Sequence, residues 1–364
     1  MNTIPETMEL IKELSEIDGV SGFEGAVAEV YRKYLSTILD LKTDYMGNIM
    51  GNLEGEHPNP RVLLCAHLDE LGMMVQSVLE DGRIKFINLT GWWEHIMIQQ
   101  PVIIRTKKGK VPGIIASTSS FMGKTQEELK KFSTKDVMFI DVGARDYKEA
   151  VEDFGIKPGD PVYPDVKFRP MANGDVFTGK AFDNRLGLAG IIEIIRNLSS
   201  QKHPNTVLTA ATVQEEIGSR GAIAVTNFCK PDIAIILEGP PADDIPLKPN
   251  QSQCIPGKGP HIRRIEPGMI SNGGLFRFIV NIAEELNISH QIAISQTGAT
   301  DGAIIHREFH GIPCIMMGIP VRYAHGHNSI FFLEDYRQTV KLLTEVLLRM
   351  SPEVLENIRQ NPYG

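Results

Sequence analysis

Cysteine is scarce in this chain, and its spacing excludes two kinds of site. Four cysteines occur among the 364 residues, and no two of them form a C-x-x-C pair. Disulfide frameworks and closed structural zinc sites both need paired or closely spaced thiols, so we expect neither here. Cys65 and Cys314 lie inside apolar runs, and scattered, unpaired cysteines of this kind are typical of a reduced, cytoplasmic protein.

Long apolar runs and basic clusters are also missing. No stretch approaches the roughly 20 apolar residues of a membrane-spanning helix. The first ten residues lack the basic and apolar parts of a secretory signal. The formal net charge is -8, and the densest basic run is the K-K-G-K at 107–110. We therefore expect a cytoplasmic protein that has neither a membrane nor a nucleic acid as partner.

Length and composition predict a globular protein of two domains. Hydrophobic residues make up 42% of the chain and charged residues 23%, and 364 residues exceed the size at which one core usually suffices. Residues 1–70 and 179–364 alternate strand-like and helix-like runs, which indicates an α/β domain. Residues 71–178 consist of short β-like runs separated by glycine, proline and charged turns. They predict a small barrel or sandwich inserted into the α/β domain.

Local patterns predict the individual elements. Apolar residues at helical spacing predict a first helix over 5–18. The sequence S-G-F-E at 21–24 is typical of a capping box and predicts a second helix that runs to about Leu39. Residues 239–272, rich in proline and glycine, are predicted to form a long functional loop over a cleft. Further helices are expected over 273–286 and 334–350, and further strands over 291–295 and 313–318.

Charged residues follow four of the apolar, strand-like runs. The run T-V-L-T-A-A-T-V-Q at 206–214 ends in two adjacent carboxylates, Glu215 and Glu216. Three other runs end in, or lead within a few residues to, His67, Glu238 and His325. An isolated pair of glutamates is usually a solvated turn, but in an open α/β sheet the carboxyl ends of the strands border the ligand-binding crevice. Four such strand ends therefore predict one shared site.

Asp183 is a further candidate for this site. It precedes a helix that is apolar nearly all round, and it lies between Lys180 and Arg185 in the sequence. The simpler interpretation makes it the N-cap of that helix. The alternative is that a metal ion holds this acid at the start of a buried helix, because clustered buried carboxylates repel one another unless a cation compensates.

Five nitrogen and oxygen ligands predict a two-metal site. Ligands without cysteine suit zinc, cobalt or manganese. Two metal sites with three ligands each need six ligands, and only five candidates are available. One carboxylate should therefore bind both ions. Two divalent ions, three ligand carboxylates and a bridging hydroxide would together form a neutral site that holds its own nucleophile. The proposed ligands are His67, Asp183, Glu216, Glu238 and His325.

Two further acids are predicted to serve the chemistry. Glu215, next to a ligand, is placed to take a proton from the attacking water and pass it to a leaving amine. Asp69, two residues after His67, can accept the other N–H of that imidazole and fix its tautomer. The predicted activity is therefore the hydrolysis of amide bonds.

Several motifs also resemble those of a known family over nearly the whole chain. They are A-H-L-D-E-L-G at 66–72, G-K-A-F-D-N-R at 179–185, Q-E-E-I-G-S-R-G-A at 214–222 and R-Y-A-H at 322–325. In these motifs the chain resembles the cocatalytic metalloaminopeptidases of the tetrahedral-aminopeptidase type, which include glutamyl and deblocking aminopeptidases. The resemblance implies a zinc-peptidase-like α/β catalytic domain with a mixed sheet. It also implies that the inserted β domain serves self-assembly, commonly into hollow dodecamers.

The same resemblance implies a role for each site residue. His67, Asp183 and Glu238 would hold one ion, and Asp183, Glu216 and His325 the other, with Asp183 as the bridge. Glu215 would be the general base and acid, Asp69 would orient His67, and the substrates would be peptides that lose their amino-terminal residue.

Two positions depart from the family pattern. Many relatives have aspartate where Glu238 stands. After R-Y-A-H the chain continues with G-H-N-S at 326–329, where relatives often have S-P and an acid, so His327 competes with His325 for the ligand role. The spacing from R-Y favours His325.

Two other functions remain open from the sequence. A related two-metal carboxypeptidase or N-acyl amino-acid deacylase would use the same arrangement of ligands. A non-catalytic assembly protein would share the fold, but the presence of Glu215 and of all five ligands argues against a loss of activity.

Overall fold

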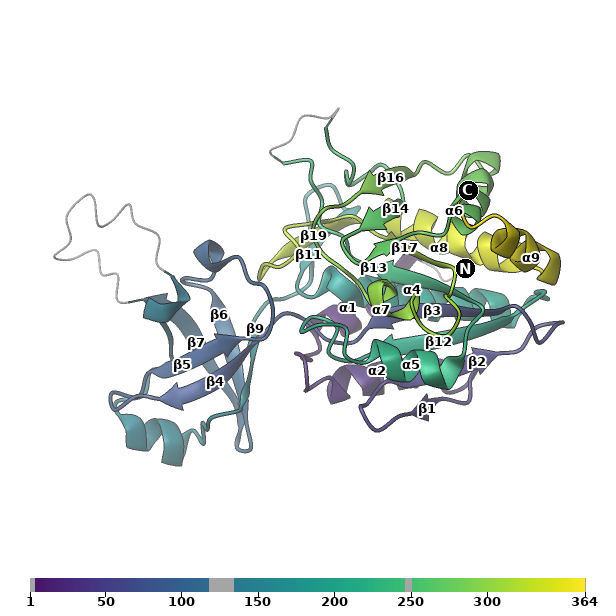
Figure 1. The fold of residues 1–364 in the computed structure, drawn as a ribbon. Coiled ribbons are helices and arrows are strands. Elements are labelled where there is room, and N and C mark those ends of the chain that lie inside the picture. The colour runs from purple at the N-terminus through teal and green to yellow at the C-terminus, as the bar shows by residue number, and fades with distance from the viewer. Residues whose placement is uncertain (1–3, 118–133, 246–250, 364) are drawn as a thin grey trace.

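The computed structural model describes residues 4–117, 134–245 and 251–363 of the chain. Figure 1 shows two parts, an α/β body and a smaller barrel that projects from one side of it. No helix within the described ranges is both long and apolar enough to cross a membrane.

A mixed sheet forms the centre of the α/β body. Its strands follow the order β1-β2-β12-β3-β13-β17-β14-β15, and β16 pairs with β14. Strands β12, β3, β13 and β17 run parallel to their neighbours, whereas β2 and β14 flank them antiparallel. The predicted mixed-sheet α/β fold is therefore confirmed. The strands are β1 (Lys42–Thr43), β2 (Ile49–Leu53), β3 (Arg61–His67), β12 (Thr206–Thr212), β13 (Ile233–Glu238), β14 (His261–Glu266), β15 (Met269–Ile270), β16 (Gln291–Ile294) and β17 (Cys314–Gly318).

Both faces of this sheet are covered, because alternate side chains of a strand point to opposite faces. In β3, Val62, Leu64 and Ala66 belong to one core, and Leu63 and Cys65 belong to the other. The larger core packs against α1 (Ile4–Glu16), α2 (Gly25–Leu35), α4 (Phe182–Ser199), α6 (Gly273–Glu285), α8 (Leu333–Arg349) and α9 (Pro352–Gln360). The smaller core packs against α5 (Ala222–Cys229) and α7 (Gly302–Ile305). Burial on both faces explains why the central strands are continuous apolar runs.

The projecting part is a closed barrel with the strand order β4-β5-β8-β7-β6-β9. A separate apolar core fills it, with Trp92, Met97 and Ile140 among its buried residues. The β-rich insert predicted as a barrel or sandwich is therefore a barrel. Its elements are β4 (Met73–Val78), β5 (Ile84–Asn88), η1 (Glu94–Ile96), β6 (Pro101–Thr106), β7 (Gly109–Ser117), η2 (Lys135–Val137), β8 (Met138–Asp141), η3 (Glu149–Asp153) and β9 (Pro161–Pro164).

A small second sheet lies next to the point where the chain re-enters the α/β body. It has the order β10-β11-β19-β18 and antiparallel pairing throughout. Strands β18 and β19 are joined by the turn that carries His325. The sheet thus fixes both ends of that turn. The strands are β10 (Arg169–Pro170), β11 (Val176–Gly179), β18 (Val321–Arg322) and β19 (Ser329–Phe332).

The predicted capping box at 21–24 is wrong. Helix α2 begins at Gly25, and its N-cap residue Glu24 makes no side-chain cap hydrogen bond. The Ser21 hydroxyl donates instead to Asp69 at 2.6 Å, and Glu24 accepts from the backbone N–H of Gln214 at 3.1 Å. Both side chains hold the segments that carry the predicted site residues, a tertiary use that a local pattern cannot reveal.

The prediction of a long loop over 239–272 is only partly right. Strand β14 and the short β15 lie within this range, and β14 pairs with β17 in the central sheet. The adjacent arginines in H-I-R-R-I-E obscure the apolar alternation of a strand. Cross-strand pairing with the buried β17 outweighs this weak local signal.

A buried ion network lies where the barrel meets the α/β body. The Lys180 Nζ is 2.7 Å from Glu70 Oε1 and 3.2 Å from Asp18 Oδ1, and its side chain is 3% exposed. Lys110 of β7 donates to the other Asp18 oxygen at 2.6 Å. Arg185 Nη2 lies 3.5 Å from Glu70. The network therefore connects α4, the end of α1, the segment after β3 and the barrel.

Replacement of Lys180 by methionine should destabilise the fold, because it leaves the buried Glu70 without its closest cation. Loss of one partner of a buried ion pair costs about 3–5 kcal/mol, and we expect about 3 kcal/mol here because Arg185 remains close. Denaturant unfolding of the Lys180→Met variant measures the loss. The matched control is Lys202→Met, whose side chain is 89% exposed and should matter by less than about 1 kcal/mol. Equal losses in both variants would contradict the role of the network.

Candidate metal centre

The carboxyl ends of the parallel strands meet at one edge of the sheet, as the sequence predicted. Strand β3 ends at His67 and β13 ends at Glu238. Strand β12 ends at Thr212, three residues before Glu215. Because these strands are parallel neighbours, their last side chains lie side by side.

Asp183 joins them from the start of α4. The N-cap of α4 is Ala181, in the left-handed region at φ 58, and Asp183 itself has non-helical backbone angles. Asp183 is therefore not the cap of this helix, and the simpler interpretation from the sequence is wrong. The Asn184 side chain donates to the Leu237 carbonyl at 2.7 Å, which holds the first turn of α4 against the end of β13.

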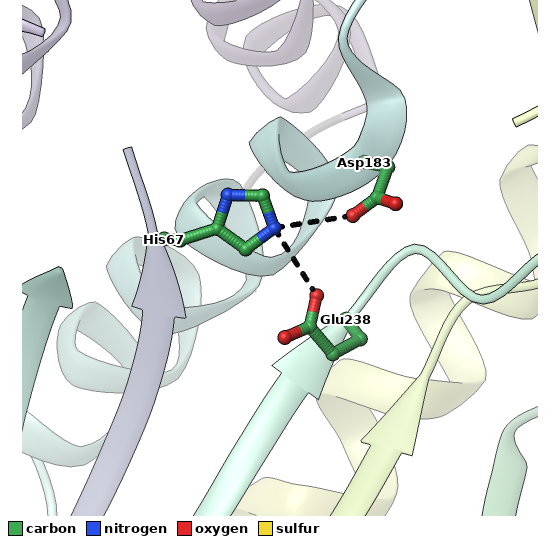
Figure 2. A group of neighbouring side chains, drawn as sticks. All are labelled: His67, Asp183 and Glu238. Carbon is green, nitrogen blue, oxygen red and sulfur yellow. Dashed lines mark hydrogen bonds and ion pairs between the residues drawn. The ribbon is translucent and has the colours of Figure 1, made fainter. Parts of the chain in front are cut away.

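The first cluster of site residues is His67, Asp183 and Glu238 (Figure 2). His67 Nε2 lies 3.3 Å from Asp183 Oδ1 and 3.5 Å from Glu238 Oε2. One potential ligand atom from each residue lies within 4.8 Å of the other two. We call these residues the first ligand group.

The second cluster, Asp183, Glu216 and His325, shares one residue with the first. His325 Nε2 lies 3.7 Å from Asp183 Oδ2 and 3.9 Å from Glu216 Oε2. Asp183 thus turns one carboxylate oxygen toward each histidine. We call these residues the second ligand group.

Glu215 and Asp69 lie beside the two groups. Glu215 Oε2 is 3.9 Å from His67 Nε2, and its side chain is 11% exposed. The nearest acceptor of His67 Nδ1 is the backbone carbonyl of Asp69 at 2.9 Å, whereas the Asp69 carboxylate is 3.5 Å away. That carboxylate accepts from the backbone N–H groups of Glu215 and Glu216 at 3.0 and 3.1 Å. Asp69 therefore contacts both the imidazole and the turn that carries the two glutamates.

His327, the competitor of His325, lies outside both groups. It is 2% exposed, and neither ring nitrogen has a hydrogen-bond partner. Its ring centroid lies 4.8 Å from that of Trp92 in the barrel. Of the two histidines, His325 is the one that faces Asp183 and Glu216.

The pKa values of the clustered groups are strongly shifted. Burial, together with the charge of Asp183, raises the pKa of Glu216 from its ordinary 4.5 to about 7. Burial raises the pKa of Glu238 to about 8, although His67 acts against it. Burial acts to lower the pKa of His67, but Glu238 and Asp183 outweigh it and raise that pKa well above its ordinary value. Such shifts arise where negative charges meet without a compensating cation.

The cations closest to Asp183 in the sequence do not neutralise it. Lys180 is bound to Glu70 and Asp18, and Arg185 donates to the Leu14 carbonyl at 2.8 Å.

The donor set therefore fits divalent metal ions. It offers imidazole nitrogens and carboxylate oxygens, which suit zinc, cobalt or manganese. Glu216 Oε1 is buried and has no hydrogen-bond partner, and a buried polar atom without a partner is costly unless a ligand satisfies it. Each ligand group could hold a metal ion.

Comparison with known proteins agrees with this interpretation. A family model described as M42 glutamyl aminopeptidase matches residues 47–342. The chain belongs to the M42 glutamyl aminopeptidase family. It is therefore a peptidase of a metal-dependent family, and the two ligand groups are residues that could bind the metal.

Individual M42 relatives match over nearly their full length. The glutamyl aminopeptidase of Lactococcus lactis subsp. cremoris is 29% identical, with 97% of this chain and 99% of the relative covered. The crystal structure of a TET aminopeptidase from the archaeon Thaumarchaeota archaeon SCGC AB-539-E09 is 37% identical, with a TM-score of 0.93, over 97% of this chain and 99% of that one. The TET1 peptidase of Pyrococcus horikoshii, which can assemble into a tetrahedron or a large octahedral shell, is 28% identical, with a TM-score of 0.85, over 94% and 100%. The resemblance to tetrahedral aminopeptidases is therefore confirmed.

Both ligand groups line a cleft of about 840 Å³. Its other walls come from residues 239–243, from 253–254 and from 293–300, in agreement with the predicted loop over a cleft. Arg263 and His261 also line the cleft, but they were not predicted from the sequence, because β14 was expected to be part of a loop. Burial, and then the charge of Arg263, lowers the pKa of His261 to about 3, so this imidazole is neutral.

Asp301 is a third residue near the site that no sequence pattern indicated. It is 1% exposed and accepts at 2.6 Å from the hydroxyl of Thr212, the last residue of β12. Burial raises its pKa, although the Thr212 hydroxyl acts against this. Nothing in the sequence distinguishes it from an ordinary turn aspartate, because its burial is decided by the packing of α7.

The metal-free protein should lose stability as the pH rises. Glu216 and Glu238 ionise near pH 4.5 in the unfolded chain but near pH 7 and pH 8 in the folded protein. Since the unfolded chain releases these protons first, the free energy of unfolding should fall between about pH 4.5 and about pH 8. The raised pKa of His67 also makes the free energy of unfolding fall with pH, above the ordinary histidine pKa of 6.5.

Bound Zn(II) should remove most of this pH dependence, because the ion replaces the protons as the compensating charge. Thermal midpoints of chelator-treated protein, measured across this pH range with and without added Zn(II), test the expectation. A metal-free protein that is equally stable at both ends of the range would contradict it.

Proposed function

We propose that this M42 peptidase removes amino-terminal residues from peptides with two divalent ions in each subunit. The observation that carries the proposal is the position of Asp183, which turns one carboxylate oxygen toward each of two histidines. A shared carboxylate of this kind suits a pair of ions that act on one substrate. Zinc or cobalt, and also manganese, match the nitrogen and oxygen donors.

The two ligand groups would each hold one ion. His67, Asp183 and Glu238 would bind the first, and Asp183, Glu216 and His325 the second. When bound, the ions would act as Lewis acids that activate a water molecule and polarise the scissile carbonyl group. Glu238 is longer by one methylene than aspartate, and its Oε2 still reaches within 3.5 Å of His67 Nε2.

Glu215 would move the proton. It belongs to neither ligand group, yet its carboxylate borders the first group at 3.9 Å from His67 Nε2. Burial raises its pKa well above the ordinary value, although His67 acts against this. A carboxylate with a raised pKa is suited to take a proton from water near neutral pH and return it to the leaving amine.

Asp69 would hold the histidine and the two glutamates in position. Its carbonyl fixes the His67 ring through Nδ1, which directs Nε2 toward Asp183 and Glu238. Its carboxylate holds the backbone of Glu215 and Glu216, so that the first points to His67 and the second to His325. We assign it a positioning role.

We further propose that residues 71–178 form an inserted domain that serves self-assembly into a homo-oligomer such as a dodecamer. The TET1 peptidase of Pyrococcus horikoshii forms large closed shells, and a dodecamer of it is known. The barrel carries exposed apolar side chains, among them Trp93 at 61% and Ile114 at 48% exposure, which suit a contact surface. The mass of the protein in solution, measured by light scattering, tests this proposal.

Glu215→Gln should abolish most of the activity without loss of the ions. A positioned general acid and base contributes about 10²–10⁴-fold to the rate, so kcat on an amino-acid amide should fall by that factor. Calorimetric titration with Zn(II) should still count two ions, because Glu215 lies outside both ligand groups. The control is Glu284→Gln, an exposed position on α6 that should leave kcat unchanged. A Glu215→Gln enzyme with normal kcat would refute the role.

A matched pair of peptides distinguishes an aminopeptidase from a two-metal deacylase or carboxypeptidase. We expect release of the first residue from a peptide with a free amino terminus and none from the same peptide after acetylation. Chelation should abolish the release, and Zn(II), Co(II) or Mn(II) should restore it. Release of acetate would favour a deacylase, and release of the last residue would favour a carboxypeptidase.

A further inference from the structure

A loop of the barrel, residues 90–92, contacts the second ligand group directly. The Thr90 hydroxyl donates to Glu216 Oε2 at 2.9 Å. The Gly91 carbonyl oxygen lies 2.9 Å from His325 Nδ1. Since a carbonyl oxygen only accepts, Nδ1 must carry a proton, and Nε2 is the ring nitrogen that faces Asp183 and Glu216. Two of the three side chains in this group are therefore bonded to the barrel.

The turn that carries His325 needs this support. His325 and Tyr323 both lie in the left-handed region, at φ 63 and φ 61, which residues other than glycine rarely adopt. His327, two residues on, packs its ring against Trp92. A backbone in a rare conformation persists when its surroundings hold it, and here the barrel is part of those surroundings.

The loop is itself anchored in the barrel. The Trp92 indole N–H donates to the Gly72 carbonyl at 3.0 Å, and the Leu89 backbone N–H donates to the same oxygen at 3.0 Å. The Trp92 side chain is 8% exposed and belongs to the barrel core. Residues 90–92 therefore keep their position for as long as the barrel is folded.

The first ligand group is held differently. His67 is oriented by the carbonyl of Asp69, which follows β3 in the α/β body. Glu238 is the last residue of the central strand β13. The contacts that orient these two residues thus come from the α/β body, and those of Glu216 and His325 come partly from the barrel.

We propose that the barrel completes the second ligand group, with Thr90 and the Gly91 carbonyl as positioning groups for Glu216 and His325. The inference rests on the two-ion centre proposed above. The inserted domain then has a role inside each subunit, beyond assembly, because it tunes the affinity of one ion and leaves the other to the α/β body. Partners that hydrogen-bond to metal ligands typically contribute 10–100-fold to metal affinity.

Thr90→Val tests this proposal, because valine keeps the shape of threonine and removes the hydroxyl. Chelated protein is titrated with Co(II) by calorimetry, and the visible absorption of Co(II) is followed in parallel. A His325→Ala variant, which lacks a ligand, identifies the binding phase of the second group. Thr90→Val should weaken that phase by about tenfold and leave the other phase unchanged.

Two further variants separate positioning from general damage to the barrel. Thr90→Ser keeps the hydroxyl and should restore the affinity. Thr106→Val removes a hydroxyl that bonds to the Phe154 carbonyl at 3.2 Å inside the barrel, and it should leave both phases unchanged.

The outcomes are distinct. If Thr90→Val binds both ions with wild-type affinities, the inference is overturned and the two-ion centre remains intact. An equal loss of affinity in both phases would have the same consequence. A wild-type protein that binds fewer than two ions would overturn the two-ion centre, and this inference with it.

Discussion

Repulsion between buried carboxylates is the constraint on which the rest of this structure depends. Asp183, Glu216 and Glu238 converge with Glu215 at one edge of the sheet, and burial raises the pKa values of all three glutamates. The basic residues next to Asp183 in the sequence bind elsewhere, since Lys180 pairs with Glu70. The compensating charge can therefore come from the two histidines, from protons on the carboxylates, and from the metal ions on which this family depends. Such a cluster of potential ligands is consistent with membership of a metal-dependent peptidase family.

The two adjacent glutamates can serve different purposes because a third carboxylate controls their backbone. Asp69 is fully buried, and it accepts from the N–H groups of both Glu215 and Glu216. Its own charge is stabilised by Ser21 as well, and His67 and these hydrogen bonds lower its pKa against the effect of burial. Neighbouring residues in the chain thereby point to different histidines, one as a proposed proton carrier and the other as a proposed ligand.

The position of the barrel in the chain has a physical consequence for the site. The chain leaves the α/β body just after β3, which ends at His67, and α4 with Asp183 begins soon after it returns. Both junctions therefore border the ligand groups. A loop between β5 and β6 can reach the site for this reason, and Lys110 of the barrel reaches Asp18 at the same junction.

The sequence alone was sufficient to predict the α/β fold and the β-rich insert, and it indicated the five proposed ligands that the structure brings close together. Continuous apolar strands require burial on both faces, and parallel strands bring their carboxyl ends together, so the residues that follow them could be grouped without coordinates. Tertiary structure decided what depends on contacts between distant segments: the hydrogen bonds of Ser21 and Asp69, the inclusion of β14 in the sheet, the burial of Asp301 and the exclusion of His327 from the site. It also decided that Thr90 touches Glu216. A threonine in a barrel loop has no distinctive pattern, because its partner lies 126 residues away in the chain.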